Sequence, residues 1–521
     1  MFQNLKGKKV LVMGLGIAGG GLSVVKWLLK QGATITITDL RTKKELMPTL
    51  KKIKNLRPQN LGMRPQNRRI LQSQNLRIVQ PQNLRTGLQR LRARRVLSFS
   101  GCRIQSLRNP LSFSGCRYVL GLHRAKDFKN ADLIIKNPAV PPDSPYLKIA
   151  KKYHVPIASD IEIFFQRWPG KNIALTGTKG KSTTVNLIYH ILQQARKPCY
   201  LGGNVGQTPL LFLPHAKSHH LAILELSSFQ LEDLKIKPDI SIITNLFPDH
   251  LNRHKTIKKY VLAKTNIFKH QSAKQYTILN YDNKSVRQLA SQIKAKLIFF
   301  STKTTVCPAA CQMLFCLKNN QLALVKPTSS CYFGSLNKIK LKGQHNLENI
   351  LAATAAVYLC QIKPTIIIKA INNFTAIPHR LELIRVTGGV KYYNDTTATN
   401  PGATSVALDA LAKDKNIILI AGGADKNLNF RGLVPKIKKT CRQVLLLTGT
   451  ATPKLKQTLQ KIKYPGQNIL EFNNLSAAVK TAKEIARAGE VVLLSPACAS
   501  FGLFANEFDR GKQFIRLVKK L

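Results

Sequence analysis

Short apolar runs recur along the chain, and polar or glycine-rich turns follow most of them. Lys9–Met13, Asn172–Leu175, Leu221–Leu224 and Ile240–Thr244 are runs of this kind. Strands that are buried on both faces of a parallel sheet read as near-continuous apolar runs, so these segments are predicted to be such strands. An amphipathic stretch follows the second run, with apolar residues at helical spacing: Val185, Leu187, Ile188, Ile191 and Leu192. Strands that alternate with helices predict the α/β class.

The length of 521 residues is enough for about three domains, each with its own core. Trp168-Pro169-Gly170 predicts one domain boundary, and Ile377-Pro378 predicts a second. We therefore predict three α/β domains: a Rossmann-like N-terminal domain over 1–168, a central P-loop ATPase-like domain over 169–377, and a Rossmann-like C-terminal domain over 378–521.

Residues 55–117 differ in composition from everything around them. They contain 13 Arg and no Lys, Asp or Glu, and Leu-Ser-Phe-Ser-Gly-Cys-Arg occurs twice, at 97–103 and 111–117. The repeats carry no consistent core pattern, which predicts a basic, disordered, low-complexity insertion in the first domain. A helix ending near Lys54 and a strand at Tyr118–Gly121 are expected to flank it. Such an insertion is tolerable because loop closure costs only about 0.6 kcal/mol per doubling of length.

The net charge is +58, from 82 basic and 24 acidic residues. Such a balance often accompanies nucleic-acid binding. Outside the insertion, however, the remaining charge of +45 comes mostly from scattered Lys, without an aromatic-interleaved basic stripe. We therefore do not expect a nucleic-acid partner. An RNA-binding arm formed by the insertion is the alternative.

Other features of the composition indicate a cytoplasmic protein that does not span a membrane. No apolar run reaches 18 residues, and Met1–Lys6 lacks the apolar core of a signal peptide. Ten cysteines in a chain of this length do not indicate a disulfide scaffold. Cys307, Cys311, Cys316 and Cys331 are spaced unlike paired CxxC zinc ligands, so we interpret them as scattered core cysteines rather than a metal site.

The segment Thr176–Thr183 reads Thr-Gly-Thr-Lys-Gly-Lys-Ser-Thr, between a predicted strand and a predicted helix. Glycines allow backbone N–H groups to approach phosphate oxygens, and the helix N-terminus adds roughly half a positive charge. Lys181 would reach the β- and γ-phosphates, and the Ser182 hydroxyl could ligate Mg²⁺. The spacing GxxGK[ST] is shorter than the common P-loop, but it predicts the same ligand, ATP.

A second glycine turn, Gly14-Leu15-Gly16-Ile17-Ala18-Gly19, joins the strand Lys9–Met13 to a helix, and the next strand ends at Asp39. This arrangement is a Rossmann-like fingerprint. Taken alone it does not establish a dinucleotide. It indicates that an anionic, nucleotide-like group meets a helix N-terminus.

Two further polar groups stand at the ends of predicted strands. Glu225 follows Leu221–Leu224, where a carboxylate suits Mg²⁺ coordination, although a helix-capping or surface role is the alternative. Asp249-His250 follows Ile240–Thr244 and could bind a second cation or position phosphate. These placements predict a metal-assisted phosphate site near the carboxyl ends of the strands.

The order of these and later motifs resembles the Mur ligases, the ATP-dependent amide ligases of peptidoglycan precursor synthesis. The resemblance covers essentially the whole chain outside 55–117. GGNVG, ELSSFQLE and LSPACAS favour the branch that adds D-glutamate over those that add L-alanine, a diamino acid or a dipeptide. The motifs that carry the resemblance are TGTKGKST, ELSSFQLE, NLFPDHLNRH, GQHNLENILAA, PHR, NDTTATN, GGADKNLNF and LSPACASF.

The resemblance implies that ATP phosphorylates the terminal carboxylate of UDP-N-acetylmuramoyl-L-alanine and that the amine of D-glutamate then attacks the acyl phosphate. The implied UDP-binding residues are Gly14, Leu15, Gly16, Ile17, Ala18, Asp39, Leu40 and Arg41. The implied ATP-binding residues are Gly177, Thr178, Lys179, Gly180, Lys181, Ser182, Thr183, Asn346, Asn349, Arg380 and Asp395.

It further implies that Lys426 and Ser500 hold the D-glutamate carboxylates and that Asn204 positions the acyl phosphate. The implied catalytic residues are Lys181, Glu225, His250, Lys264 and Asn204. Two Mg²⁺ ions are implied, with Ser182, Glu225, His250 and Lys264 as ligands. Lys264 would be carbamylated, so that a lysine becomes an anionic oxygen ligand. We expect the enzyme to be a monomer.

The sequence departs from the family pattern at several positions. Thr397 replaces a common Lys, Lys179 a common Asn, Ala139 a common Gly, and Glu507 an aromatic residue. Another Mur-type ligase with a different substrate is the nearest alternative. A degenerate ligase that binds nucleic acid and a nicotinamide dehydrogenase are more remote, and the latter leaves Thr176–Thr183 unexplained.

Overall fold

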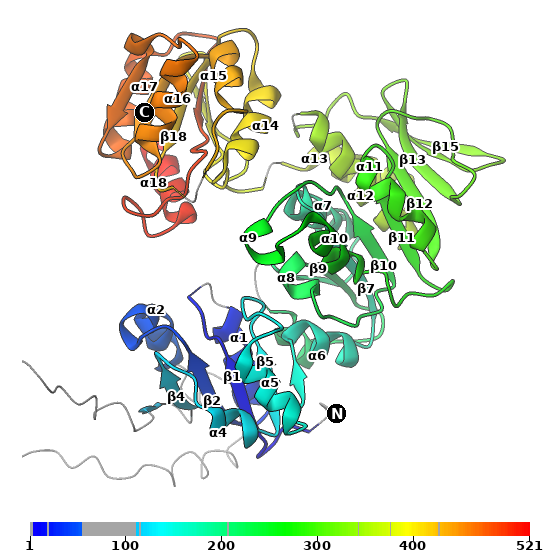
Figure 1. Cartoon of the computed structure of the whole chain (residues 1–521). Coiled ribbons are helices and arrows are strands. Elements are labelled where there is room, and N and C mark those ends of the chain that lie inside the picture. Colours follow the sequence, from blue (N-terminus) through cyan, green and yellow to red (C-terminus); the bar gives the residue numbers. More distant parts are fainter. Residues whose placement is uncertain are drawn as a thin grey trace, which may run out of the picture. The chain divides into compact units, whose positions relative to one another are not determined.

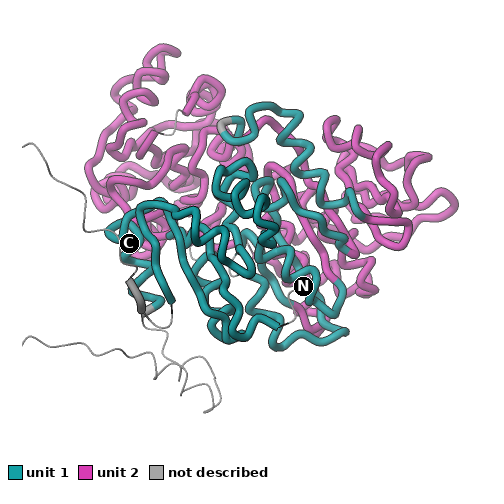
Figure 2. The backbone as a smooth tube through the Cα atoms, turned by 60° about the horizontal axis from the view of Figure 1, so that its bottom comes forward, with its two compact units in different colours: residues 1–171, 200–238, 250–270 teal, residues 172–199, 239–249, 271–521 magenta. Residues whose placement is uncertain are grey.

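The computed structural model describes residues 4–17, 20–54, 111–113, 116–205, 208–341, 343–375, 377–425 and 428–521. It confirms the α/β class, with three mainly parallel sheets (Figure 1). The described residues divide into two compact units, coloured separately in Figure 2. Unit 1 comprises residues 1–171, 200–238 and 250–270, and unit 2 comprises 172–199, 239–249 and 271–521. The domain boundaries drawn from the sequence stay predictions.

The N-terminal sheet lies in unit 1 and has the strand order β3-β4-β2-β1-β5-β6. Its pairs are parallel except for β3 with β4, and Val10 of β1 pairs with Ile35 and Leu133 on its two sides. The strands are β1 (Lys9–Met13), β2 (Thr34–Asp39), β3 (Leu111–Phe113), β4 (Cys116–Leu120), β5 (Leu133–Lys136) and β6 (Ile157–Ala158), and the helices are α1 (Gly20–Lys30), α2 (Lys43–Lys54), α4 (Ala125–Lys129), α5 (Pro145–Lys152) and α6 (Asp160–Arg167).

The structure corrects one end of the predicted insertion. Residues 111–113 and 116–117 belong to an antiparallel pair of strands, so the prediction of a disordered segment extends too far toward the C-terminus. In β4, Arg117 is exposed between the buried residues Cys116 and Tyr118, and Val119 is buried as well. Residues 55–110 lie outside the described residues.

Unit 1 also contains the elements within residues 200–238 and 250–270. Strand β9 is buried throughout, and α8 begins with a capping box between Ser227 and Gln230. The elements are β8 (Cys199–Gly203), whose first residue belongs to unit 2, η3 (Pro209–Leu211), η4 (Leu213–His215), β9 (Leu221–Glu225), α8 (Ser228–Leu231), α9 (Leu251–His254) and α10 (Ile257–Thr265).

In unit 2, a second sheet runs in the order β15-β14-β13-β12-β11-β10-β7. The strands from β7 to β13 pair in parallel, whereas β13, β14 and β15 form an antiparallel meander. The elements are β7 (Lys171–Thr176), α7 (Lys181–Gln194), β10 (Ile240–Ile243), β11 (Tyr276–Asn280), α11 (Lys284–Arg287), η5 (Gln288–Gln292), β12 (Lys296–Ser301), β13 (Met313–Lys318), β14 (Gln321–Val325), β15 (Ser330–Ser335), α12 (Gln344–Leu359) and α13 (Pro364–Asn373).

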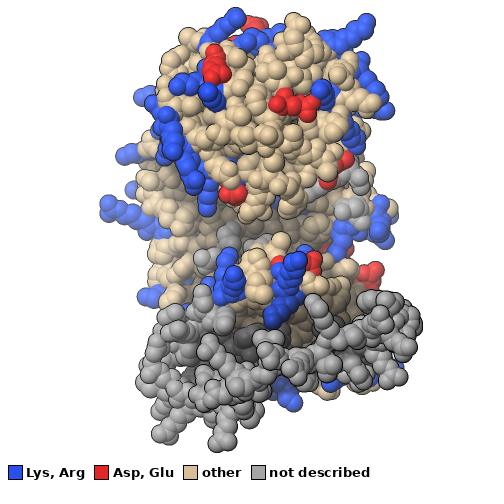
Figure 3. Space-filling view, turned by 90° about the vertical axis from the view of Figure 1, so that its left-hand side faces the viewer, with Lys and Arg blue, Asp and Glu red and all other residues tan. Residues whose placement is uncertain are grey.

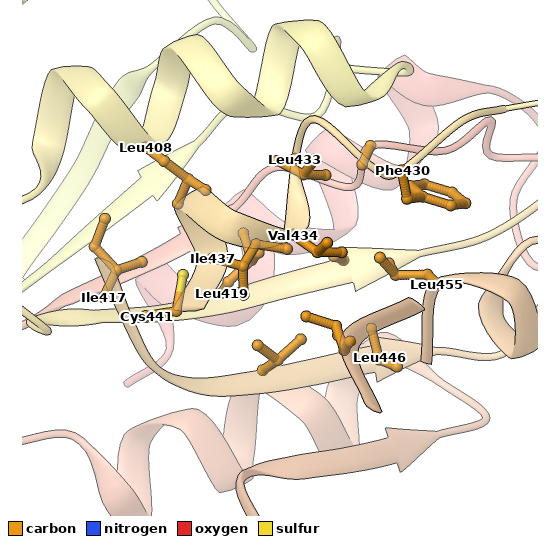
Figure 4. Packing of buried hydrophobic residues seen from close by; sticks show 14 of the residues in the cluster. Leu408, Ile417, Leu419, Phe430, Leu433, Val434, Ile437, Cys441, Leu446 and Leu455 are labelled. Atoms are coloured by element: carbon orange, nitrogen blue, oxygen red, sulfur yellow. The ribbon is translucent and has the colours of Figure 1, made fainter. Parts of the chain in front are cut away.

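The C-terminal sheet, also in unit 2, has the order β16-β17-β21-β18-β19-β20 and is parallel apart from β16 with β17. Figure 4 shows one of its cores, where Leu408 of α14, Ile437 of α15 and Leu455 of α16 meet the sheet residues Leu419 and Leu446. The elements are β16 (Glu382–Thr387), β17 (Val390–Asn394), α14 (Pro401–Leu411), β18 (Ile417–Gly422), α15 (Val434–Thr440), β19 (Cys441–Leu447), α16 (Thr452–Lys461), η6 (Gly466–Asn468), β20 (Ile469–Phe472), α17 (Leu475–Ile485), β21 (Val491–Leu494) and α18 (Glu507–Lys519).

Candidate active site

The predicted phosphate loop lies between β7 and α7, as the sequence pattern indicated. Gly177 and Gly180 have φ angles of +152° and +80°. A Cβ atom at Gly177 would lie 2.0 Å from Thr244 Oγ1, and one at Gly180 would lie 2.2 Å from Asn349 Oδ1. Both positions therefore require glycine for conformation and for space.

Hydrogen bonds to the segment after β10 fix the loop. The backbone N–H groups of Thr178 and Lys179 donate to the carbonyl oxygen and to Oδ1 of Asn245, at 2.8 and 2.7 Å. Lys181 Nζ donates to the carbonyl oxygens of Gly177 and Thr178, at 3.0 and 3.1 Å. The ammonium group is thus held against the loop, which concentrates positive charge where phosphates would bind.

Unit 2 contains a cavity of about 910 Å³, a size suited to a nucleotide. Asn349 joins the cavity wall to α7, because its Oδ1 accepts from Thr184 Oγ1 at 3.2 Å while its Nδ2 donates to Asn346 Oδ1 at 3.0 Å. Arg380 Nη2 donates to Ser182 Oγ at 3.4 Å. The predicted ATP-binding residues that line this cavity are Lys179, Gly180, Thr183, Asn346, Asn349, Arg380 and Asp395.

The remaining predicted residues of the phosphate loop, Gly177, Thr178, Lys181 and Ser182, do not line the cavity. Sequence reasoning missed several residues that do, among them Asn245, Phe247, His345 and Tyr393. The first three lie within NLFPDHLNRH and GQHNLENILAA, so motif membership was the signal that could have identified them.

Asp395, which follows β17, also lines the cavity of unit 2. Its Oδ1 accepts the N–H of Leu381 at 3.2 Å, and its Oδ2 accepts the hydroxyl of Ser495 at 2.8 Å. Burial raises the pKa of Asp395 to about 7. Thr397, at the position where Lys is common, also lines the cavity and donates through Oγ1 to the carbonyl oxygen of His379 at 3.0 Å.

The predicted D-glutamate residues are only partly described. Ser500 is buried and follows Ala499, which forms a β-bridge with Ala424, whereas Lys426 lies outside the described residues. Neither Ser500 nor Glu507 lines the unit 2 cavity. Arg510, which the sequence analysis did not select, is buried nearby and donates to the carbonyl oxygens of Thr396 and Cys498.

In unit 1, a carboxylate holds the N-terminal glycine turn. Asp39 Oδ2 accepts the N–H of Gly16 at 3.0 Å, and Oδ1 accepts the N–H of Arg41 at 2.9 Å. Leu15 is buried, whereas Ile17, Leu40 and Arg41 are exposed. Asp39 thus organises the turn, and the exposed side chains lie beside it.

Unit 1 contains a cavity of about 460 Å³. Of the described residues predicted to bind UDP, only Gly14 lines it, and Ala18 lies outside the described residues. Asn204 lines the cavity as well. The residues that sequence reasoning missed include Asn137, Ser227, Phe229, Gln230 and Arg253, all but the first of which lie in the quoted motifs ELSSFQLE and NLFPDHLNRH.

Glu225 ends β9 with its side chain almost fully buried. Oε1 accepts from Asn204 Nδ2 at 2.8 Å, while Oε2 is buried without a hydrogen-bond partner. A buried carboxylate oxygen without a partner is costly, and a cation would satisfy it. Among the described residues, no group of three or more His, Cys, Asp or Glu side chains could hold a metal ion.

His250 and Lys264 approach the same aromatic ring. The His250 ring centroid lies 6.5 Å from that of Tyr260, and Lys264 Nζ lies 5.0 Å from the Tyr260 centroid. His250 precedes α9 with a φ of +52°, and Lys264 is buried in α10. The structure therefore brings these two predicted residues to one aromatic residue and brings Glu225 to Asn204.

None of the described helices combines the length and the apolar character that crossing a membrane requires. Lys and Arg side chains are spread over the face shown in Figure 3, with few acidic residues between them.

Family models match the three regions of the chain in order. The Mur ligase MurD-like N-terminal domain matches residues 8–82, the Mur ligase middle domain matches 175–357, and the Mur ligase glutamate ligase domain matches 379–498. The first match ends within 55–117. A phosphate loop, a nucleotide-sized cavity and this domain order define an ATP-using ligase, and the chain belongs to the Mur ligase family.

Curated relatives resolve the family further. A UDP-N-acetylmuramoylalanine–D-glutamate ligase from Roseiflexus sp. is 36% identical, covering 99% of both chains. Enzymes of the same name from Acetivibrio thermocellus and Clostridioides difficile are 37% and 32% identical, covering 78% and 100% of this chain and 86% and 100% of theirs. The family resemblance drawn from the motifs is confirmed, and the alternative functions are not favoured.

Solved structures support the three-domain fold. The UDP-N-acetylmuramate–alanine ligase MurC from Thermotoga maritima has a TM-score of 0.55 at 17% identity, covering 98% of this chain and 99% of that one. The MurF ligase from Thermotoga maritima in complex with ADP has a TM-score of 0.52 at 19% identity, covering 75% and 88%.

Proposed function

We propose that this chain catalyses the ATP-dependent joining of D-glutamate to UDP-N-acetylmuramoyl-L-alanine in peptidoglycan precursor synthesis. The observation that carries the proposal is the 36% identity to a D-glutamate ligase over 99% of both chains. The phosphate loop and the buried Glu225 supply a chemical reason for the same reaction.

Unit 2 binds ATP in this proposal. The ammonium group of Lys181, which lies on the loop carbonyl oxygens, would offset phosphate charge that would otherwise repel an incoming carboxylate. Arg380, which bonds Ser182, adds a second cation beside the loop. Asn346 and Asn349 hold the cavity wall in a fixed geometry through their mutual hydrogen bond.

Unit 1 binds the sugar nucleotide. Arg253 is fixed there by Glu232 Oε2 at 2.9 Å and donates to the carbonyl oxygens of Ala139 and Val140, at 3.0 and 3.2 Å. Arg253, Asn137 and Gln230 offer donors at the cavity wall to a polyoxygenated ligand. The glycine turn and Asp39 serve the uridine group.

Two Mg²⁺ ions are part of this proposal, and the buried Glu225 oxygen that lacks a hydrogen-bond partner would be one of their ligands. The family resemblance implies Ser182, His250 and a carbamylated Lys264 as further ligands. Bound there, magnesium would neutralise the negative charge shared by the triphosphate and the acceptor carboxylate. Carbamylation joins the Lys264 amine to CO₂ with loss of a proton, and it converts a cation into a carboxylate-like ligand.

The acceptor carboxylate attacks the γ-phosphorus, and ADP leaves. The amine of D-glutamate, whose carboxylates Lys426 and Ser500 would hold, then attacks the acyl carbonyl carbon. Its nitrogen loses a proton to solvent, and phosphate leaves from the tetrahedral intermediate. Asn204, already bonded to Glu225, positions the acyl phosphate. Monomeric state and cytoplasmic location stay predictions.

The test mixes purified chain, UDP-N-acetylmuramoyl-L-alanine, ATP and Mg²⁺ with either D- or L-glutamate and follows phosphate release. We expect release with the D-isomer only. A panel of other amino acids identifies a different Mur-type ligase if one of them supports release and D-glutamate does not.

A further inference from the structure

Two thiols lie side by side in the loop between β12 and β13. The Sγ atoms of Cys307 and Cys311 are 3.1 Å apart, and the Cys307 thiol also donates to the carbonyl oxygen of Cys311 at 3.8 Å. Both are free cysteines. A disulfide bond is about 2.05 Å long, so the two sulfurs need to approach by only about 1 Å. The proposed ligase mechanism uses neither residue.

We propose that Cys307 and Cys311 form a reversible disulfide and that this loop is a site of oxidative modification. The proposal concerns a part of the chain outside the ligase chemistry, so it stands or falls independently of the D-glutamate activity.

Hydrogen bonds hold both ends of the loop in place. At its start, Ser301 Oγ accepts the N–H groups of Lys303 and Thr304, at 3.0 and 2.9 Å. At its end, the N–H of Gln312 donates to the carbonyl oxygen of Leu297 at 3.0 Å. A turn between the cysteines is closed by the N–H of Cys311, which donates to Pro308 at 3.0 Å. The folded chain therefore keeps the two thiols adjacent.

The two thiols differ in access to solvent, which sets the order of reaction. Cys307 is partly exposed, whereas Cys311 is buried, and burial raises the pKa of the Cys311 thiol to about 12. The thiolate is the nucleophile in thiol–disulfide exchange, so Cys307 reacts first.

The oxidant in this scheme is a low-molecular-weight disulfide such as glutathione disulfide. The Cys307 thiolate attacks one of its sulfurs and releases one glutathione thiolate. Cys311 then loses its proton and attacks Sγ of Cys307, releasing the second glutathione. Two protein thiols are oxidised to one disulfide, and one glutathione disulfide is reduced to two thiols.

The other two cysteines of the cluster do not complete a metal site. Cys316 lies in β13 opposite Ser301, and Cys331 is exposed on β15 opposite Leu324. In the part of the chain that the structure describes, no set of three or more metal-ligating His, Cys, Asp or Glu side chains occurs. The adjacency of two thiols without a third ligand favours covalent pairing over metal binding.

The experiment treats the full chain with glutathione disulfide, blocks remaining thiols, digests the protein and identifies cysteine peptides by mass spectrometry. We expect a peptide containing Cys307 and Cys311 that is lighter by two hydrogens, with loss of two thiols per chain and recovery of both on adding dithiothreitol. Cys331→Ser is the matched control and should retain the linked peptide, whereas Cys307→Ser and Cys311→Ser should lose it.

A wild-type chain that carries glutathione on Cys307 without linking to Cys311 would overturn the proposal. So would a link from Cys307 to a different cysteine. The wild-type peptide map decides the matter even if a serine variant folds poorly. The oxidised wild type should also melt at a higher temperature than the reduced form, because the link restricts the unfolded chain.

Discussion

The chain contains two strand–glycine turn–helix segments that look alike in sequence, and the structure uses them differently. In the N-terminal turn, the N–H of Gly16 is already bonded to the carboxylate of Asp39. In the central loop, a carbonyl and an amide oxygen of Asn245 hold two N–H groups, and the ammonium of Lys181 lies on the loop carbonyls. One turn is organised by a negative charge and the other by a positive one.

This difference teaches that a glycine pattern alone does not specify what binds to it. A carboxylate at the turn disfavours phosphate in the same place, whereas a lysine favours it. In unit 2 the comparison supports the proposal of ATP, because the positive charge of Lys181 lies on the phosphate loop.

The largest effect is expected from removing Lys181, which supplies the positive charge of the central loop. Lys181→Ala should lower ATP-dependent phosphate release by about 100-fold or more, since it removes a preorganised charge from the phosphate loop. Lys179→Ala is the comparison variant: Lys179 also lines the cavity, but the loop is anchored through its backbone rather than its side chain, so a smaller loss is expected. Equal losses in both variants, measured as kcat/KM for ATP, would contradict the special role of Lys181.

The glycines offer a second contrast. Gly180→Ala forces a Cβ atom to within 2.2 Å of Asn349 Oδ1, whereas at Gly16 the nearest atom lies 3.9 Å away. We expect Gly180→Ala to raise the KM for ATP by more than about 10-fold, since a shift of Asn349 breaks its bonds to Thr184 and Asn346. Gly16→Ala should cost only the left-handed backbone strain of about 1–2 kcal/mol. Similar ATP affinities in the two variants would count against this account.

A variant of Glu225 tests whether this carboxylate of unit 1 binds a cation. Glu225→Gln preserves an oxygen that can accept from Asn204 but removes the negative charge that a cation would meet. We expect a higher Mg²⁺ concentration at half-maximal phosphate release, with little change in melting temperature. An unchanged magnesium dependence would place the cation elsewhere. Asn204→Ala is a useful companion, because it removes the hydrogen bond and leaves the charge.

The smallest expected effect is a pH dependence of stability. The pKa of the Asp395 carboxyl is about 7 in the folded chain, against an ordinary value of 3.8. The folded chain therefore binds the carboxyl proton more tightly than the unfolded chain does. The free energy of unfolding that this group contributes is therefore present below about pH 4 and is lost as the pH rises toward 7. Asp395→Asn should remove that part of the slope in denaturant titrations. A slope unchanged between pH 4 and 7 would contradict the shift.

Local pattern was enough to predict much of the fold. The apolar runs at Lys9–Met13 and Ile240–Ile243 are buried strands, and the helix ending near Lys54 is present. These predictions succeeded because burial on both faces of a parallel sheet leaves a direct record in consecutive residues. At Leu111–Phe113 the same reasoning failed. The repeated segment was interpreted as part of a disordered insertion, but its second copy contains β3, the edge strand that pairs with β4.

The sequence by itself determined the class of the protein, the position of its phosphate loop and the order of its motifs, because each depends on residues that are neighbours in the chain. Tertiary structure decided which side chains contact one another. Asn204 meets Glu225, Asn349 meets Thr184, and Cys307 meets Cys311 in a thiol pair whose spacing gave no hint of it. The first two contacts join residues that are 21 and 165 positions apart, and the thiol contact depends on the turn closed by the N–H of Cys311. Hydrophobic periodicity carries no information about either kind of contact.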